Sequence, residues 1–272
     1  MSSRRGRFSW HSSIVVALLS MAAPALGDSE PTPIAPAQDN SVFEEGLLSN
    51  GAGEHLFSGN TSFSDARRAL LAFDVSILPA RSTVTEVVVQ LRCTLSPVVN
   101  NASQSFNLHR LTADWGEAGS DAGDPGGMGA PAETGDATWS ERFFGQDLPW
   151  GTPGGDFVAT PSATVSVGSC NGGPPLGVQF LSTPELVADV QGWLDDPSSN
   201  FGWILIGNEG ANTTARRFAS RENGDPTLHP SVLVATEVGD DVPATSPTGL
   251  TLLVLLMATA SAFVRRRARS VR

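Results

Sequence analysis

Residues 84–95 read VTEVVVQLRCTL, and this stretch decides the class of fold. Its apolar residues Val87, Val89, Leu91 and Cys93 occupy every second position, and polar side chains stand at several of the positions between them. An apolar residue at every second position is the period of a β-strand with one buried face. The stretch therefore predicts a long, half-buried strand.

Similar short runs occur on both sides of this strand, separated by Gly, Pro, Asn and Asp, which favour turns. They predict an all-β fold, an antiparallel jelly-roll-like β-sandwich formed as one domain over residues 39–237. The run 201–206 alternates less cleanly, so we expect it to be central and covered on both faces. The expected strands are residues 41–44, 68–75, 84–95, 106–111, 163–167, 178–181, 201–206, 215–221 and 231–237.

One short helix is expected among these strands. Thr183 can cap its N-terminus, Pro184 stands at the first helical position, and Glu185 favours the positive end of the helix dipole. Asp196-Pro197 ends it. The apolar residues that share one face at helical spacing are Leu186, Val190, Trp193 and Leu194.

A stretch of unusual composition, residues 114–156, lies between two expected strands. It is rich in Gly and in acidic residues, and it holds three of the six Trp residues. Disordered segments avoid Trp because an aromatic ring favours burial. We therefore expect a long, ordered Gly/Asp/Trp-rich loop that packs over one sheet.

Six short motifs occur in order along the expected domain: DWGE (114–117), GDATW (135–139), PGGDF (153–157), DVQGWL (189–194), FGW (201–203) and SREN (220–223). Together they resemble the DNRLRE domain. That family is a β-sandwich module of bacterial and archaeal secreted proteins, and some of its members are grouped with carbohydrate-binding modules. The resemblance covers residues 39–237 and implies no shared catalytic residues.

The Trp residues of the long loop are candidates for a polysaccharide-binding face. Flat aromatic rings stack on the C–H surfaces of sugars when they are exposed beside polar groups that bind the hydroxyls. Trp115, Trp139 and Trp150 would supply such rings. The alternative is that these rings form the core that holds the loop on the sandwich.

The start of the same loop is a candidate Ca²⁺ site. Asp114, Glu117, Asp121 and Asp124 could supply carboxylate ligands, and the Gly residues between them would let backbone carbonyls turn inward. Their spacing differs from that of an EF-hand loop, which ends in a bidentate Glu. The alternative is an acidic loop that only contacts solvent. No other cofactor is expected.

The sequence contains no motif for catalysis. It lacks the G-x-S-x-G, H-E-x-x-H, C-x-x-C and P-loop patterns, and its four His residues show no metal-ligand spacing. We therefore expect a protein that is not an enzyme. An enzyme that degrades polysaccharide is the less favoured alternative, and it would need two opposed carboxylates.

The charges divide the chain into three parts. All 17 basic residues are Arg, and the net charge is −11. Residues 28–241 hold all 28 acidic residues but only nine of the Arg residues, and the remaining Arg residues lie at the two ends. An acidic central part argues against nucleic acid as a partner.

The N-terminal residues 1–27 are typical of a secretory signal peptide. The apolar run 14–19 is followed by the small-residue cleavage site Ala25-Leu26-Gly27, and the run is too short for a retained anchor to be favoured. Residues 28–38 are polar and Pro-rich, which predicts a linker. Export would place Cys93 and Cys170 in an oxidising compartment, where they either form a disulfide or remain as buried thiols.

The C-terminal end is expected to reach a membrane. Residues 249–264 carry no charge and predict a transmembrane segment, and the Arg-rich tail 265–272 would remain cytoplasmic. The linker 238–248 contains Val242-Pro243. The whole arrangement resembles the bacterial sorting signals of the IPTL-CTERM and PEP-CTERM type, which implies recognition by a sorting protease at the membrane. The alternative is a permanent single-span anchor.

The sequence thus predicts an exported, non-catalytic module of the cell surface or extracellular matrix. Its domain would lie on the extracytoplasmic side of the membrane, either anchored or released by cleavage. Polysaccharide is the expected partner, and a purely structural envelope scaffold is the alternative.

Overall fold

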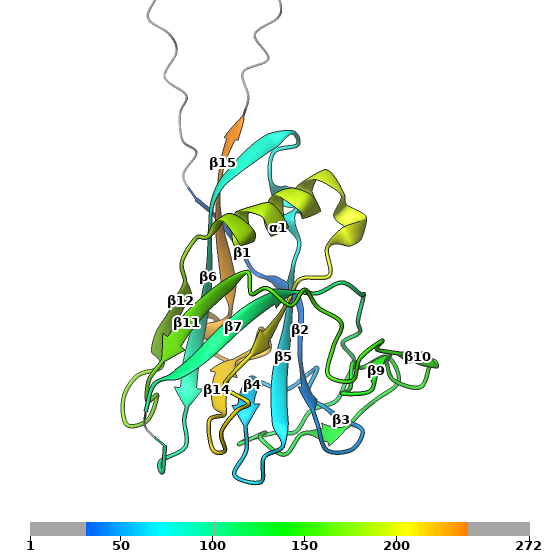
Figure 1. Cartoon of the computed structure of the whole chain (residues 1–272), viewed down its shortest axis with the longest axis vertical. Coiled ribbons are helices and arrows are strands. Elements are labelled where there is room, and N and C mark those ends of the chain that lie inside the picture. Colours follow the sequence, from blue (N-terminus) through cyan, green and yellow to red (C-terminus); the bar gives the residue numbers. More distant parts are fainter. Residues whose placement is uncertain (1–30, 101, 239–272) are drawn as a thin grey trace, which may run out of the picture.

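The computed structural model describes residues 31–100 and 102–238, and this part of the chain is mostly β structure with one short α-helix (Figure 1). The signal peptide, Val242-Pro243 and the segment 249–264 lie outside the described residues. None of the helices within the described ranges is long and apolar enough to cross a membrane.

The strands of the main sheet, in chain order, are β1 (Thr32–Ile34), β2 (Pro36–Phe43), β4 (His55–Asn60), β5 (Ala66–Phe73), β6 (Ser82–Leu95), β7 (Gln104–Arg110), β11 (Ala163–Val167), β12 (Leu176–Phe180), β13 (Trp203–Ile206), β14 (Arg216–Ala219) and β15 (Ser231–Val238). Two small pairs lie apart from it: β3 (Leu48–Ser49) with β8 (Ala130–Pro131), and β9 (Glu141–Phe143) with β10 (Leu148–Pro149). The helix is α1 (Pro184–Asp195), and 3₁₀ turns span Val75–Ile77, Pro197–Ser199 and Pro226–Leu228.

The main sheet is antiparallel and curled (Figure 1). Its order is β1-β15-β6-β14-β4-β5-β13-β7-β11, with β12 beside β6 and β2 beside β5. The curl passes through β4, whose residues 55–58 pair with β14 while residues 59–60 pair with β5. Buried side chains from both parts of the sheet share one core on the inside of the curl.

All nine strands expected from the sequence are present, with ends that differ by a few residues. The prediction of a linker over residues 28–38 is wrong for its second half, because β1 and the start of β2 lie there. Strand β1 pairs with β15, opposite Val232–Val234. Backbone pairing of this kind requires no alternating side chains, so a Pro-rich stretch can adopt it at a sheet edge.

The main core fills the inside of the curl. Val87, Val89, Leu91 and Cys93 of β6 are at most 1% exposed, which confirms the half-buried strand expected from their alternation. Helix α1 packs against β6 and contributes Leu186, Val190 and Trp193 to this core. The ring centroids of Trp193 and Trp203 are 4.5 Å apart, so the helix packs directly on β13 as well.

The expected N-terminal cap of α1 is present. The Oγ1 atom of Thr183 accepts a hydrogen bond from the backbone N–H of Leu186, at 3.0 Å, and Pro184 occupies the first turn. The same hydroxyl donates to the carbonyl of Ser162. The cap therefore satisfies a helix N–H and also ties the helix to the segment that enters β11.

A second, smaller core lies on the outer face of β2, β5 and β13. The long loop, residues 114–156, covers this face with Trp115, Ala137 and Trp150, which pack with Leu70 and Ile204 of the sheet. Strand β13 is therefore buried on both faces, as its unclear alternation predicted. The expectation of an ordered loop packed over one sheet is confirmed.

Candidate functional site

The Trp residues proposed as a sugar platform lie mainly in the second core. Trp115 is 1% exposed and Trp150 is 4% exposed. Their indole N–H groups donate to the carbonyls of Phe201 and Thr138, each at 2.8 Å. These two rings hold the loop on the sheet, so neither can stack on an external sugar, and the prediction of an exposed platform formed by all three Trp residues is wrong.

Trp139 is the one of the three that keeps partial exposure. The guanidinium of Arg68 lies over its ring, 4.6 Å from the ring centroid. Arg68 also donates to both carboxylate oxygens of Glu209 and to the carbonyl of Gly154, each at 2.8 Å. The Trp139 ring is therefore held in place by Arg68, next to the second core.

The four acidic residues proposed as Ca²⁺ ligands do not come together as one site. Asp114 accepts a hydrogen bond from the backbone N–H of Trp115, and Asp121 accepts one from that of Gly123. Asp124 contacts other partners, which are His55 and Arg217. Within the described ranges, Glu117 is the only one of the four that belongs to a group of acidic residues close enough to share an ion.

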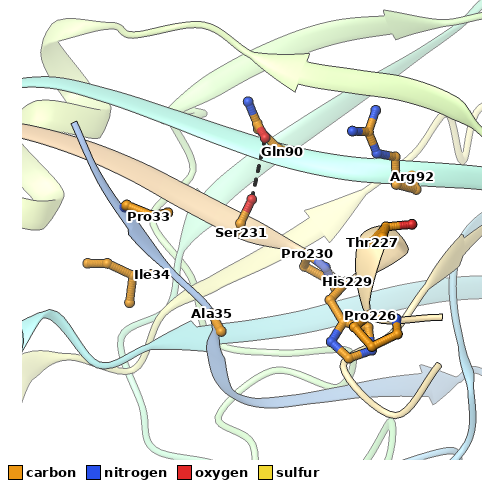
Figure 2. A pocket seen from close by; sticks show the side chains of 10 residues that line it. All are labelled: Pro33, Ile34, Ala35, Gln90, Arg92, Pro226, Thr227, His229, Pro230 and Ser231. Carbon is orange, nitrogen blue, oxygen red and sulfur yellow. Dashed lines mark hydrogen bonds between the residues drawn. The ribbon is translucent and has the colours of Figure 1, made fainter. Parts of the chain in front are cut away.

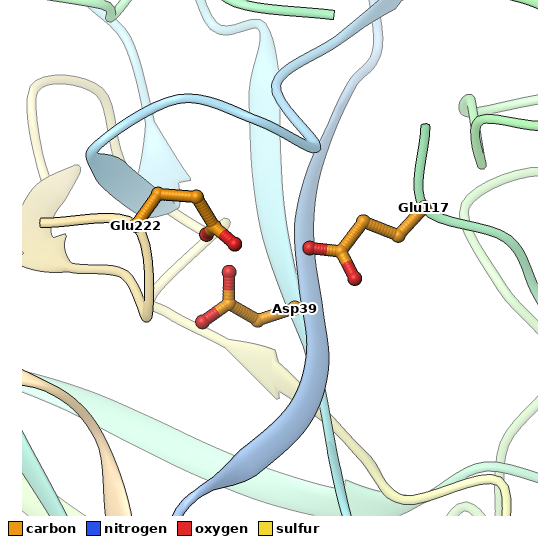
Figure 3. A group of neighbouring side chains, drawn as sticks. All are labelled: Asp39, Glu117 and Glu222. Atoms are coloured by element: carbon orange, nitrogen blue, oxygen red, sulfur yellow. The ribbon is translucent and has the colours of Figure 1, made fainter. Parts of the chain in front are cut away.

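The group that contains Glu117 also contains Asp39 and Glu222; we call it the carboxyl cluster. Asp39 comes from β2, Glu117 from the start of the long loop, and Glu222 from the turn after β14. Figure 3 shows the three carboxyl groups pointing toward one another from these segments. One oxygen of each lies within 4.8 Å of the others, so residues far apart in the sequence form one site.

Arg221 holds one side of the carboxyl cluster. Its guanidinium donates to one oxygen of Glu117, at 2.8 and 3.1 Å, and lies 3.0 Å from one oxygen of Glu222. Its backbone N–H donates to Oδ2 of Asp39 at 2.9 Å. A single residue therefore orients all three carboxyl groups, and it supplies one positive charge against them.

Burial dominates the electrostatics of the carboxyl cluster. Asp39 is fully buried, and the Glu117 and Glu222 side chains are 9% and 21% exposed. Burial raises the pKa of Asp39 well above its usual range, and the nearby Glu222 raises it further. Burial also raises the pKa of Glu222, and it raises that of Glu117 to about 7 in spite of the hydrogen bonds from Arg221.

Two oxygen atoms of the carboxyl cluster lack a partner. Within residues 31–100 and 102–238, Oδ1 of Asp39 and Oε2 of Glu222 are buried and accept no hydrogen bond. A buried polar atom without a partner is costly, and for this reason such atoms mark places where a proton, water molecule or ion belongs. The cluster is therefore the part of the described chain that could hold a metal ion.

Sequence reasoning found Glu117 but missed the residues that complete the cluster. In the sequence, Arg221 and Glu222 belong to the SREN motif and suggest a structural ion pair, and Asp39 is the first residue of the expected domain. A signal was nevertheless available, because Asp39 precedes an expected strand and a buried carboxylate at such a place requires a partner. Which partner it has depends on long-range packing, so spacing alone could not identify it.

The two cysteines form a disulfide that joins β6 to the segment after β11. Cys93 and Cys170 are 77 residues apart in the sequence, and their Cα atoms are 5.8 Å apart. Disulfides of this kind are typical of proteins in oxidising compartments outside the cytoplasm. The alternative of two buried thiols is thereby excluded.

Two of the surface pockets formed by the described residues, both away from the carboxyl cluster, have polar side chains at their walls. One, of about 330 Å³, is bordered by β1, β6 and the turn before β15, and Figure 2 shows Arg92, Gln90 and His229 at its wall. The other, of about 500 Å³, lies at the end of the long loop and is lined by Thr112, Thr152, Asp156 and Phe157 among others. The second pocket combines a partly exposed aromatic ring with hydroxyl groups and a carboxylate.

The acidic residues of two of the six sequence motifs, GDATW and DVQGWL, stabilise the fold. Asp136 accepts hydrogen bonds from the backbone N–H groups of Ala118 and Glu133. Asp189 accepts from the indole N–H of Trp203 and from the hydroxyl of Ser162.

Neither a known protein-family model nor a curated protein sequence matches this chain.

Proposed function

We propose that this chain is a non-catalytic module that is exported and displayed at the cell surface or in the extracellular matrix. The observation that carries this proposal is the Cys93–Cys170 disulfide within a β-rich domain. Disulfides persist outside the cytoplasm, where thiols are not kept reduced. The proposal agrees with the sequence at both ends. Residues 1–27 resemble a signal peptide, and residues 249–272 combine an uncharged segment with an Arg-rich tail.

The finer architecture that we propose is a jelly-roll-like β-sandwich related to the DNRLRE domain. The support is that the curled sheet encloses a single core and that the six motifs take specific places in it. Glu117 and Glu222, from the first and last motifs, meet in the carboxyl cluster. Asp189 and Trp203, from two further motifs, are joined by a hydrogen bond of 2.8 Å.

Polysaccharide is the ligand that we propose, and the pocket beside Phe157 is its binding surface. Thr112 and Thr152 are exposed at this pocket, so their hydroxyl groups can exchange hydrogen bonds with those of a sugar. Phe157 offers an apolar ring at the same place. The domain is strongly acidic, which favours a neutral polysaccharide over an anionic one.

Burial of the carboxyl cluster supports a non-catalytic role. Hydrolysis of a glycosidic bond requires two carboxyl groups on either side of the bond that is cleaved. Asp39 has no exposed surface, and the Glu117 side chain has little. A polysaccharide chain would therefore have to displace β2 or the long loop to reach them.

Affinity electrophoresis of the full chain through gels that contain neutral or acidic polysaccharides tests the ligand. We expect a neutral polysaccharide to retard the protein, and the double substitution Thr112→Ala/Thr152→Ala to weaken binding about tenfold or more, a factor that corresponds to the loss of one or two hydrogen bonds. Thr85→Ala, at an exposed position of β6, is the matched control and should bind like the parent.

A purely structural envelope scaffold is the second candidate, and the burial of Trp115 and Trp150 favours it. In that case no polysaccharide retards the protein, and the double Thr variant behaves as the parent does. That result would remove the sugar-binding part of the proposal and leave the exported scaffold.

We further propose that residues 249–264 address the chain to a membrane and that a sorting protease recognises the Val242-Pro243 region. The support is the uncharged segment between the acidic domain and the Arg-rich tail. Mass spectrometry of the mature chain checks whether residues 243–272 are removed. A chain that retains them would instead be permanently anchored.

A further inference from the structure

In their ionised form, the three carboxyl groups of the carboxyl cluster carry more charge than the described residues around them balance. Asp39, Glu117 and Glu222 bring three carboxyl groups together, and Arg221 is the cation that contacts them. With all three carboxyl groups ionised, as a cation would require, the cluster and the one guanidinium leave two negative charges in a mostly buried site. Uncompensated charge in such a site is strongly unfavourable. A divalent cation would neutralise it.

The spacing of the oxygens also suits a cation. The three candidate ligand oxygens lie within 4.8 Å of one another. Oxygens on opposite sides of a Ca²⁺ ion, each about 2.4 Å from it, are about 4.8 Å apart. The unpartnered Oδ1 of Asp39 belongs to a fully buried side chain that points into this space (Figure 3).

We propose that Asp39, Glu117 and Glu222 bind one divalent cation, and that this ion is Ca²⁺. The donors are all carboxylate oxygens, which Ca²⁺ prefers, whereas Zn²⁺ selects nitrogen and sulfur ligands. Ca²⁺ takes six to eight oxygens in a flexible arrangement. Water completes its shell through the side of Glu222, which is the most exposed of the three carboxylates.

The ion connects three distant parts of the chain. It joins β2 to the start of the long loop and to the turn after β14, and the chain between Asp39 and Glu222 includes most of the domain. A link that closes such long loops limits the freedom of the unfolded chain, as a disulfide does. The cation thus holds the long loop on the sheet, and it does so independently of any sugar bound near Phe157.

The test uses the full chain, stripped with EDTA and then titrated. We expect it to bind one Tb³⁺ ion, detected by luminescence excited through Trp, and Ca²⁺ to displace that ion. We also expect millimolar Ca²⁺ to raise the melting temperature by about 5 °C or more relative to EDTA, because an ion that binds only the folded state stabilises it. Mg²⁺ should have a much smaller effect.

Two substitutions at the cluster should remove this response. Asp39→Asn retains an acceptor for the N–H of Arg221 but loses a charge, and Glu222→Gln changes the more exposed ligand. Each should bind Tb³⁺ at least tenfold more weakly. Asp121→Asn is the matched control, because it removes an exposed carboxylate from the same loop while an amide oxygen can still accept from Gly123.

Several results would overturn the proposal. One is that the parent protein binds no Tb³⁺ and melts at the same temperature in EDTA and in Ca²⁺. This result does not depend on whether any variant folds. Another is a full Ca²⁺ response in both cluster variants. A third is stabilisation of the EDTA-treated protein by Asp39→Asn without any effect of Ca²⁺, which would mean that Asp39 and Glu222 share a proton instead of an ion.

Discussion

The carboxylates of Asp39 and Asp136 are both fully buried, yet they have different roles. Both oxygens of Asp136 accept hydrogen bonds from backbone N–H groups of the long loop. Asp39 receives one such bond, and its other oxygen has no partner within the described part of the chain. Both oxygens of Asp136 are thus satisfied within the fold. Asp39, by contrast, is the member of the cluster that most requires a ligand.

The shifted pKa of the single residue His109 predicts how the free energy of unfolding depends on pH. Burial lowers its pKa below the ordinary value, and the charge of Arg68 lowers it further. The folded state therefore favours the neutral ring, whose contribution to stability is present above about pH 6.5 and is lost as the pH falls through the depressed pKa. His55, whose pKa is also lowered mainly by burial, has the same sign.

The substitution His109→Asn isolates this effect. Its amide N–H₂ can still donate to the carbonyl of Val158, which lies 2.9 Å from the His109 ring nitrogen. We expect the variant to lose less stability than the parent between about pH 7 and pH 5, as measured by urea unfolding. An equal loss in both proteins would show that His109 does not contribute.

At the scale of elements, packing patterns could be predicted from the sequence and pairing partners could not. Strand β6 has an alternation that one buried face requires, and α1 has a cap and an apolar stripe. By contrast, β1 and β4 were missed. β1 is a short, Pro-containing edge strand, and β4 (HLFSGN) is buried along its whole length, so neither shows a period of two.

The candidate site divides in the same way. Glu117 was predicted as a metal ligand because its loop combines acids with Gly. Asp39 and Glu222 lie in other elements, and only the curl of the sheet brings them to Glu117. Packing of the long loop on the outer face of β2, β5 and β13 buries Trp115 and Trp150, whose exposure the composition of the loop could not determine.

The burial of Trp150 predicts how much the packing of the long loop on the sheet contributes to the free energy of unfolding. Its side chain is 4% exposed and fills the second core. Removal of a buried Trp side chain leaves a cavity, so Trp150→Ala should lower the free energy of unfolding by about 3–5 kcal/mol. Urea unfolding followed by circular dichroism measures this.

The partly exposed Trp139 provides the comparison for this prediction. Trp139→Ala should cost clearly less stability, because part of its ring already contacts solvent. A small effect of Trp150→Ala would mean that the loop contributes little to the stability of the sheet.

At the scale of the whole molecule, the disulfide closes a loop of 77 residues. A cross-link of this length restricts the unfolded chain by about 4.5 kcal/mol in the chain-entropy description. Replacement of Cys93 and Cys170 by Ser together should lower the free energy of unfolding by roughly this amount. Guanidinium unfolding of the double variant against the parent checks it, and unchanged stability would mean that the bridge is not formed in solution.

Export of this acidic, disulfide-linked domain is the proposal on which the others depend. It is tested most directly by intact-mass spectrometry, under non-reducing conditions, of the full chain recovered from fractionated cells that produce it. We predict a chain outside the cytoplasm that begins at Asp28, with Cys93 and Cys170 joined. A cytoplasmic chain that retains residues 1–27 and two free thiols would contradict the account.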